Sequence, residues 1–196
     1  LARAGRSEAI LRVESRLRVQ GPAVGPDLIF ALVKKPALDL IVEKAVELGV
    51  GRLRPVRTRF AQRDQLNLVR AAAHVRGAVQ QCERLDVPEV VPPMDLDELT
   101  SSWPADRPLV LAAESGASEA AVPVLARLGG GPPPGLLVGP EGGFHESELD
   151  ALGDLPFVHA VHLGPRILRA ETACLALLAV WQAVGGDWQD RPRSSG

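Results

Sequence analysis

LLVGPEGGF at residues 136–144 and LGPRILRAETA at residues 163–173 decide how this chain folds. Each segment begins with a short apolar stretch, turns through glycine, and ends where the composition predicts the start of a helix. Short apolar stretches that alternate with amphipathic helices are typical of an α/β fold with a mostly parallel sheet flanked by helices. Ligands bind at the carboxyl ends of the strands in such sheets. We therefore expect both segments to line a ligand site.

The same alternation extends over most of the chain. A helix is expected from about Pro36 to Gly49, because proline suits a first helical turn and glycine a helix end. The other expected strands are 28–33, 52–56, 87–91, 108–114, 136–138 and 157–163, and the other expected helices are 66–84, 95–102, 118–128, 146–152 and 168–184. Residues 11–19 alternate apolar and polar side chains, which predicts one more, half-buried strand. A polar tail is expected from residue 185 onward.

The charge of the chain is unevenly distributed. The net charge is −2, but residues 1–76 hold 15 Lys or Arg and 7 Asp or Glu, whereas residues 77–196 hold 7 and 17. A basic half on an acidic protein indicates a polyanionic partner such as nucleic acid, although an uneven solvated surface would look the same. Cys82 and Cys174 have no ligand pattern around them, so we expect neither a zinc site nor a disulfide framework.

No apolar run approaches the length of a membrane span, and the first residues lack the apolar core of a signal peptide. A cytoplasmic location without membrane contact is therefore expected.

The glycines of the first segment allow a ligand to approach the backbone closely. The helix expected after His145 would present free N–H groups to a carboxylate, and Glu148 is spaced to complete a capping box with His145. A phosphate-binding loop is excluded because no G-K-[ST] follows, and a dinucleotide fold because no GxGxxG is present. A plain strand-to-helix turn stays open as the alternative.

In the second segment an apolar pair, Ile167 and Leu168, lies between Arg166 and Arg169. The apolar pair could line a slot for adenine while the arginines face a polyanion. A helix start with two exposed arginines is the alternative. Two glycine turns about 25 residues apart in one sheet favour a shared ligand site over two unrelated turns.

Together, GPEGGF and LGPRILRAETA resemble the signature of the RsmE family, the 16S rRNA (uracil-N3) methyltransferases of the SPOUT class. Upstream, KKPALDLIVEKAVELGV (34–50), TRF (58–60) and QQCERLDVPEV (80–90) resemble further segments of that family, so the resemblance extends from about residue 28 to residue 184. Three residues depart from the family pattern: Gln80, Glu83 and His145. Gln80 is uncharged, so an ionic role is not expected at this position.

The resemblance implies a SPOUT-type sheet with a C-terminal trefoil knot, S-adenosylmethionine as cofactor, no metal, and a homodimer with the knotted region at its interface. It implies methylation of N3 of a uridine in 16S rRNA, with the assembled 30S subunit as the expected partner. The implied domain is residues 25–187, preceded by a remnant of a PUA-like barrel with its linker (1–24) and followed by a tail (188–196). A SPOUT enzyme acting on another RNA such as tRNA, or a non-catalytic RNA-binding relative, are the alternatives.

By the matched motifs, the resemblance assigns the cofactor to three segments. The expected contacts are Leu111, Ala112, Ala113, Glu114, Val138, Gly139, Pro140, Glu141, Gly142, Gly143, Leu163, Gly164, Ile167, Leu168 and Thr172. For catalysis, Arg169 or Arg166 would stabilise the uracil anion, and Glu141 or Glu171 would accept its proton or orient an arginine. The expected contacts to RNA phosphates are Lys34, Lys35, Arg57, Arg59, Arg63 and Arg84. His74, His159 and His162 are expected to be structural.

Overall fold

A computed structural model describes residues 3–4, 9–10, 12–16, 18–113 and 118–190. Its main sheet has the strand order β5-β4-β3-β9-β7-β10-β8, with β6 beside β4, and neighbouring strands run parallel throughout. The strands are β3 (Asp27–Ala31), β4 (Arg52–Arg57), β5 (Glu89–Val90), β6 (Met94–Asp95), β7 (Leu109–Ala112), β8 (Glu119–Ala120), β9 (Gly135–Val138) and β10 (Val158–His162). The predicted α/β class and parallel sheet are confirmed, whereas the trefoil knot stays a prediction.

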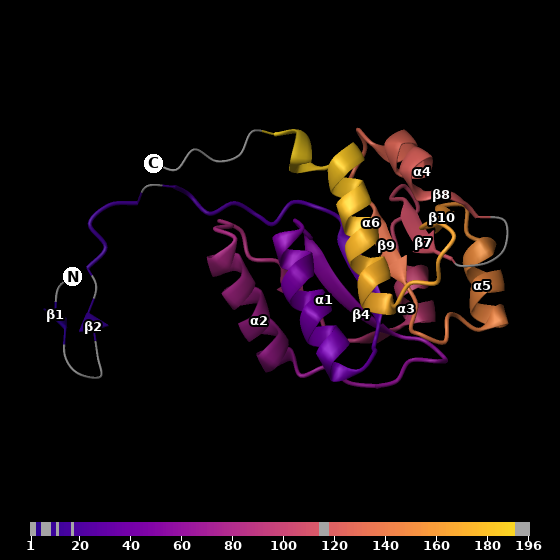
Figure 1. Cartoon of the computed structure of the whole chain (residues 1–196), viewed down its shortest axis with the longest axis horizontal. Helices are drawn as coiled ribbons and strands as arrows, with labels where there is room; N and C mark the ends of the chain where they lie inside the picture. Colours follow the sequence, from indigo (N-terminus) through magenta and orange to yellow (C-terminus); the bar gives the residue numbers. More distant parts are fainter. Residues whose placement is uncertain (1–2, 5–8, 11, 17, 114–117, 191–196) are drawn as a thin grey trace.

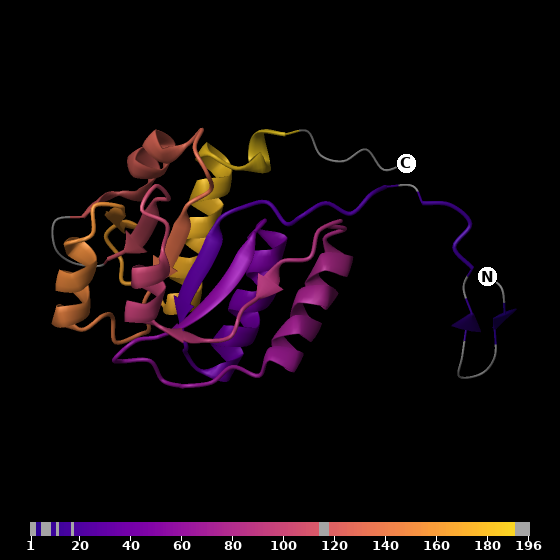
Figure 2. The ribbon, with the colours of Figure 1, turned by 180° about the vertical axis from the view of Figure 1, so that it is seen from behind.

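Helices cover both faces of the sheet. Figure 1 looks at the face that carries α1 (Lys35–Glu47), α2 (Leu68–Gln81), α4 (Ala121–Leu128) and α6 (Ala170–Val184), and Figure 2 looks at the opposite face. The opposite face carries α3 (Leu96–Ser102) and α5 (Glu146–Gly153), whose buried leucines pack with Ile29 and Val56. Because both sides of β3 are buried, its sequence is a continuous apolar run and not an alternating one.

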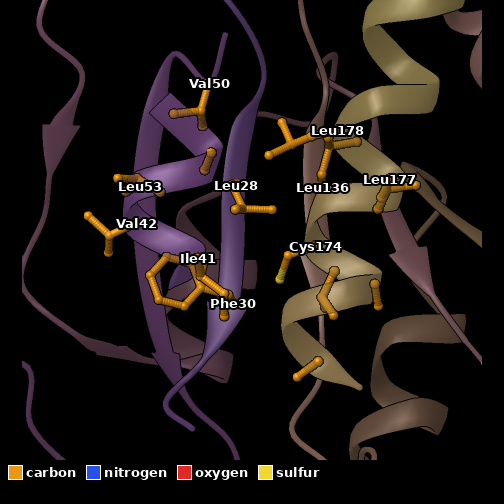
Figure 3. Packing of buried hydrophobic residues seen from close by; sticks show 14 of the residues in the cluster. Leu28, Phe30, Ile41, Val42, Val50, Leu53, Leu136, Cys174, Leu177 and Leu178 are labelled. Atoms are coloured by element: carbon orange, nitrogen blue, oxygen red, sulfur yellow. The ribbon is translucent and has the colours of Figure 1, made fainter. Parts of the chain in front are cut away.

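The larger core lies between the sheet and the helices α1 and α6. Leu28 and Phe30 of β3 belong to one buried cluster with Ile41 of α1 and Leu177 of α6, and Figure 3 shows α1 and α6 flanking these β3 side chains. Cys174 of α6 is completely buried in the same core, and burial, together with the nearby Glu171 carboxylate, raises the pKa of its thiol far above the usual value. This cysteine is therefore a packing residue, as a cysteine in an apolar helix suggests.

The two helices of this core are also tied together at their carboxyl-terminal ends. Gln182 of α6 is buried, its Nε2 donates to the Leu48 carbonyl at 2.7 Å, and its Oε1 accepts from the Asp187 N–H at 3.0 Å. Gly49 ends α1 with a φ of +75°, and a Cβ there would lie 2.2 Å from Gln182 Nε2. The predicted helix end at Gly49 is confirmed, and the residue must be glycine both for its φ and for this contact.

A buried ion-pair network closes the amino-terminal edge of the sheet. Asp27, the first residue of β3, accepts from Arg107 Nη2 at 2.9 Å and from Arg54 Nε. Both guanidinium groups also lie over the ring of Trp103, at 5.7 Å for Arg54 and 4.8 Å for Arg107. Asp27 is 5% exposed, so its charge is compensated by these two partners and not by water.

The predicted strand over residues 11–19 is wrong. In the part of this segment that the structure describes, residues 12–16 and 18–19 form no strand, and Val13 and Val19 are 86% and 68% exposed. Two short strands, β1 (Arg3–Ala4) and β2 (Ala9–Ile10), pair with each other upstream and lie apart from the main sheet in Figure 1. Among the residues that the structure describes, no strand pairs with this segment, although a half-buried strand requires such a neighbour.

Other boundaries follow the predictions with small shifts. The helix expected over 118–128 begins only at Ala121, because Pro123 suits its first turn, and the residues before it form β8. Beyond α6 the chain makes a short 3₁₀ helix, η1 (Asp187–Gln189). No helix among the described residues has the length and the apolar character that crossing a bilayer requires.

Candidate functional site

A cavity of about 430 Å³ opens at the carboxyl ends of β7, β9 and β10. Its lining comes from three segments that are far apart in the sequence: residues 112–113, residues 138–144 and residues 161–168. Leu149 of α5 and two alanines of α6, Ala170 and Ala173, complete it. The two glycine turns that the sequence singled out therefore form the walls of one cavity, at the edge of the sheet where a ligand was expected.

The first wall is the turn from β9 into α5. A Cβ on Gly139 would lie 2.8 Å from Cε2 of Phe144, whose ring folds back over the turn and itself lines the cavity. Gly143 has a φ of +70°, which favours glycine. The predicted capping box is confirmed: Ser147 N–H donates to His145 Nδ1 at 3.2 Å, and His145 N–H donates to Glu148 Oε2 at 2.8 Å.

The second wall is the turn from β10 into α6. Gly164 has a φ of +100°, and the chain then carries Arg166 and Ile167 along the rim with their side chains exposed. Leu168 is half-buried against the main core and lines the cavity. Arg169 is the N-cap of α6 and is exposed. The two members of the expected apolar pair therefore differ: Ile167 is 86% exposed, whereas Leu168 faces the cavity and the core.

Most of the predicted cofactor contacts line this cavity. They are Ala112, Ala113, Val138, Gly139, Pro140, Glu141, Gly142, Gly143, Leu163, Gly164, Ile167 and Leu168. Leu111 is buried within β7, Thr172 is exposed on α6, and neither lines the cavity, whereas Glu114 lies outside the described residues. Of the predicted catalytic residues the cavity includes Arg166 and Glu141 but not Arg169 or Glu171.

Several lining residues were not predicted from the sequence: Phe144, Leu149, Val161, His162, Ala170 and Ala173. Val161 and His162 belong to the end of β10, next to a motif that was recognised. The signal that could have included them is their position at the carboxyl end of a parallel strand.

The loop between β4 and α2 packs against the first wall from outside. The Phe60 ring lies 5.7 Å from the His145 ring, and a Cβ on Gly142 would lie 3.3 Å from Phe60 Cβ. Gln62 Nε2 donates to Glu141 Oε2 at 3.0 Å. This loop thus fixes the position of the Glu141 carboxylate at the cavity, through contacts between residues about 80 positions apart in the sequence.

Arg59, in the same loop, was predicted to contact RNA. Its backbone N–H donates to Glu148 Oε1 at 2.8 Å, and its Nη1 lies 3.3 Å from His145 Nε2, so its side chain is exposed directly beside the cavity wall. Lys34, Lys35 and Arg63 are also exposed. These four residues stay candidates for phosphate contacts.

The other two predicted RNA contacts are engaged within the protein. Arg84 donates to the Val46 carbonyl at 2.8 Å and the Val50 carbonyl at 3.0 Å and pairs with Asp86, and only 11% of its side chain is exposed. Arg57 pairs with Asp95 at 2.7 Å and is less exposed than the four candidates above. The Arg84 guanidinium donates to one carbonyl in the last turn of α1 and to another just beyond the helix, so fewer of its N–H groups face solvent than in the four exposed candidates, and its contact to RNA stays a prediction.

Comparison with known proteins identifies the family to which these segments belong. A sequence profile of the RNA methyltransferase domain family matches residues 23–182. The chain is 32% identical over 197 residues to the ribosomal RNA small subunit methyltransferase E of Mycobacterium bovis, covering 94% of this chain and 73% of the relative. It superimposes on the crystal structure of a ribosomal RNA small subunit methyltransferase E from Neisseria gonorrhoeae bound to S-adenosyl methionine, with a TM-score of 0.77, 30% identity, and coverage of 84% and 68%.

A TrmH/SpoU tRNA modifying enzyme from A. aeolicus shares the fold, with a TM-score of 0.54 and 16% identity over 87% of this chain and 78% of the other. The predicted SPOUT fold class is therefore confirmed. With the profile match over most of its length and a relative above 30% identity, this chain belongs to the ribosomal RNA small subunit methyltransferase E family.

Proposed function

We propose that this chain transfers a methyl group from S-adenosylmethionine to N3 of a uridine in 16S rRNA. The observation that carries this proposal is the cavity between the two glycine turns, with Arg166 and Glu141 both at its lining. The family and the S-adenosyl methionine bound to the superimposed relative support the same donor and the same class of substrate.

The cavity fits the proposed donor in size and in character. Its volume of about 430 Å³ lies within the range of small-molecule sites, about 300–1,000 Å³. Val138, Leu163 and Leu168 offer an apolar slot for adenine, and the backbone groups of the two turns offer hydrogen bonds to its edge. Gly139 lets the backbone approach a ligand where a side chain would meet Phe144.

The donor, when bound, supplies a methyl group on a sulfonium that leaves as a neutral thioether, so the protein mainly positions the reactants. The uracil N3–H must lose its proton, and the resulting anion must be stabilised. In this proposal Arg166, which lines the cavity, donates hydrogen bonds to a uracil carbonyl oxygen at the rim. Glu141 Oε2 accepts from Gln62, which leaves Oε1 to accept the N3 proton.

Arg169 and Glu171 are less directly placed for the reaction. Arg169 lies at the helix start outside the cavity lining, and Glu171 lies in the first turn of α6, where a carboxylate is favourable for the helix dipole. We keep Arg169 as a candidate contact to the RNA strand and assign Glu171 to the helix.

The proposal extends to a homodimer that acts on the 30S subunit in the cytoplasm, with a trefoil knot around the cavity. In this proposal residues 25–187 form the methyltransferase domain, and residues 1–24 belong to a PUA-like RNA-binding barrel and its linker. Ile167, 86% exposed at the rim of the cavity, is the side chain at which a subunit interface there can be tested.

The test is methyl transfer to purified small subunits from a strain lacking this modification, with nucleosides identified by mass spectrometry. We expect 3-methyluridine in 16S rRNA and none in tRNA or in the large subunit. Methylated tRNA would favour the tRNA enzyme, and a calorimetric titration without donor binding would favour the non-catalytic relative.

Two variants connect the activity to the cavity. Arg166→Ala should lower kcat about 100-fold or more, and Glu141→Gln about 100-fold, with donor affinity retained. Arg127→Ala and Glu146→Gln, at exposed positions outside the cavity lining, are the matched controls and should leave kcat unchanged. Full activity in Glu141→Gln would assign the proton to another acceptor.

A further inference from the structure

A second cavity, of about 320 Å³, lies between the amino-terminal halves of α1 and α2. Its polar side chains are mostly cationic or able to become so, with one carboxylate among them. They are Lys35 and Asp39 from α1, Arg63, Gln65 and Asn67 from the preceding loop, and Arg70 and His74 from α2. A cavity with this excess of positive charge is suited to an anion.

The single carboxylate, Asp39, compensates Arg70, and the positive charges of Lys35 and Arg63 remain in excess. Arg70 Nε donates to Asp39 Oδ1 at 3.1 Å and Arg70 Nη2 donates to Asp39 Oδ2 at 2.7 Å, while His74 Nε2 lies 3.4 Å from Oδ1. Arg70 holds the pKa of Asp39 below its usual value, so the carboxylate is ionised at neutral pH and keeps the guanidinium in place. Glu43 and Glu47, farther along α1, both pair with Lys44.

This pairing leaves one edge of the Arg70 guanidinium for a ligand. Nε and Nη2 face Asp39, and among the described residues Nη1 has no hydrogen-bond acceptor. A guanidinium that is anchored through one edge loses little side-chain entropy when it binds a phosphate through the other. Arg63 and Lys35 are exposed at the same cavity and supply two further cations.

The second cavity lies on the same edge of the sheet as the donor cavity. Helices α1 and α2 begin after the carboxyl ends of β3 and β4, and β3 is hydrogen-bonded to β9, the strand that leads into the donor cavity (Figure 1). The loop between β4 and α2 joins the two cavities. Phe60 and Gln62 contact the donor wall, and four residues of the same loop line the second cavity: Arg63, Gln65, Leu66 and Asn67.

We propose that the second cavity binds a backbone phosphate of the RNA whose uridine enters the donor cavity, through Arg70, Arg63 and Lys35. This inference rests on the proposed function for the identity of the RNA. A phosphodiester fits because it is a tetrahedral anion with several acceptor oxygens, and contacts of this kind position a strand without reading its sequence. Asp39 is a positioning residue that orients Arg70.

The test measures RNA affinity in the absence of donor, by fluorescence anisotropy of a labelled 16S rRNA fragment that includes the methylated region. Arg70→Gln and Arg63→Gln should each weaken binding roughly tenfold, as expected for one charge-assisted hydrogen bond. Each should also lower the slope of log affinity against log salt by about 0.7. Arg63 lies in an exposed loop, so its variant tests the cavity even if Arg70→Gln disturbs the packing of α2.

Arg127→Gln is the matched control, because Arg127 is also an exposed helical arginine held by a carboxylate: it donates to Glu119 at 2.9 and 3.0 Å. Arg127→Gln removes the same charge from α4, a helix that does not line the second cavity. Because salt screens distant charges, the RNA affinity should change less than about twofold. Equal losses in Arg127→Gln and Arg70→Gln would overturn the proposal in favour of a general charge effect.

Two further readouts separate the possible failures. Donor affinity by calorimetry should be unchanged in Arg70→Gln and Arg63→Gln, and their methyl transfer should show a raised KM with kcat retained. If inorganic phosphate stabilised the wild type but not Arg70→Gln against heat while RNA affinity stayed the same, the cavity would belong to a free phosphate and the proposal would be wrong. A wild type that binds RNA through this cavity but methylates nothing would overturn the proposed activity alone.

Discussion

Replacing Gly139 by alanine tests whether the first glycine turn shapes the donor cavity. The added Cβ would lie 2.8, 3.1 and 3.2 Å from three carbon atoms of the Phe144 ring, whereas carbon atoms in contact prefer about 3.5–4.0 Å. The ring must therefore move by roughly 1 Å, and the space beside it is the donor cavity that it lines. Overpacking of this kind costs about 1–3 kcal/mol.

If this cost falls on the donor site, the dissociation constant for S-adenosylmethionine should rise about 5- to 140-fold, because each 1.4 kcal/mol corresponds to a factor of ten. Isothermal titration calorimetry measures the constant, and thermal unfolding measures any loss of stability in the same preparations. The matched control is Gly153→Ala at the end of α5, where a Cβ would meet no atom within 4 Å and φ is not positive. It should bind the donor like the wild type.

A second substitution separates the contact with Phe144 from a loss of backbone freedom. Leucine at position 144 lacks the ring atom that lies closest to the added Cβ, so Gly139→Ala/Phe144→Leu should bind the donor more tightly than Gly139→Ala alone. Wild-type affinity in Gly139→Ala, or an equal loss in Gly153→Ala, would refute the assignment of this turn to the donor site.

Three further changes test other parts of the structure. Asp27→Asn leaves two partly buried arginines without their counter-charge and should lower the free energy of unfolding in urea by about 3 kcal/mol. The control Asp150→Asn, on the surface, should lower it by less than about 0.5 kcal/mol. Equal losses in the two variants would show that the ion-pair network does not stabilise the fold. Burial raises the pKa of the Cys174 thiol in the folded protein, so the thiol contributes fully to the free energy of unfolding below its pKa in the unfolded chain, about 8.5. Above that pH the free energy of unfolding should fall by up to about 1.4 kcal/mol per pH unit. Cys174→Ala should remove this pH dependence. In the native protein the half-buried Cys82 should react with a thiol reagent before Cys174, and the reverse order would contradict the burial. Ile167→Asp should weaken self-association at least about tenfold in sedimentation equilibrium, and an unchanged mass would place the interface elsewhere.

Local signals in the sequence account for most of the fold. Pro36 and Gly49 bound α1 because their backbone preferences act within a few residues, and β3 is recognisable because both of its faces are buried. The glycine turns predict the position of the donor cavity because the backbone preferences of glycine also act within a few residues. The two-residue strands β6 and β8 have too few residues to show any period.

Contacts between distant residues account for what the sequence did not predict. Phe60 and His145 are 85 positions apart, and no local pattern indicates that their rings meet. Arg84 was assigned to RNA because its charge suggests the surface, but carbonyls 34 and 38 positions away accept from it. The strand predicted over 11–19 is the opposite case, because the sequence has a local alternation but no strand in the described part of the chain pairs with it.

Gln182 connects the shape of the donor cavity to contacts at the opposite end of helix α6. Helix α6 has 15 residues and is therefore about 22 Å long. Its first turn forms part of the cavity, and its last turn is fixed by Gln182 to the end of α1. Because close-packed interiors transmit strain, we expect a change at Gln182 that shifts one end of α6 to displace Ala170 and Ala173 at the other end as well. Random mutagenesis that selects for altered donor affinity should therefore recover substitutions at Gln182 and Gly49, far from any atom of the ligand.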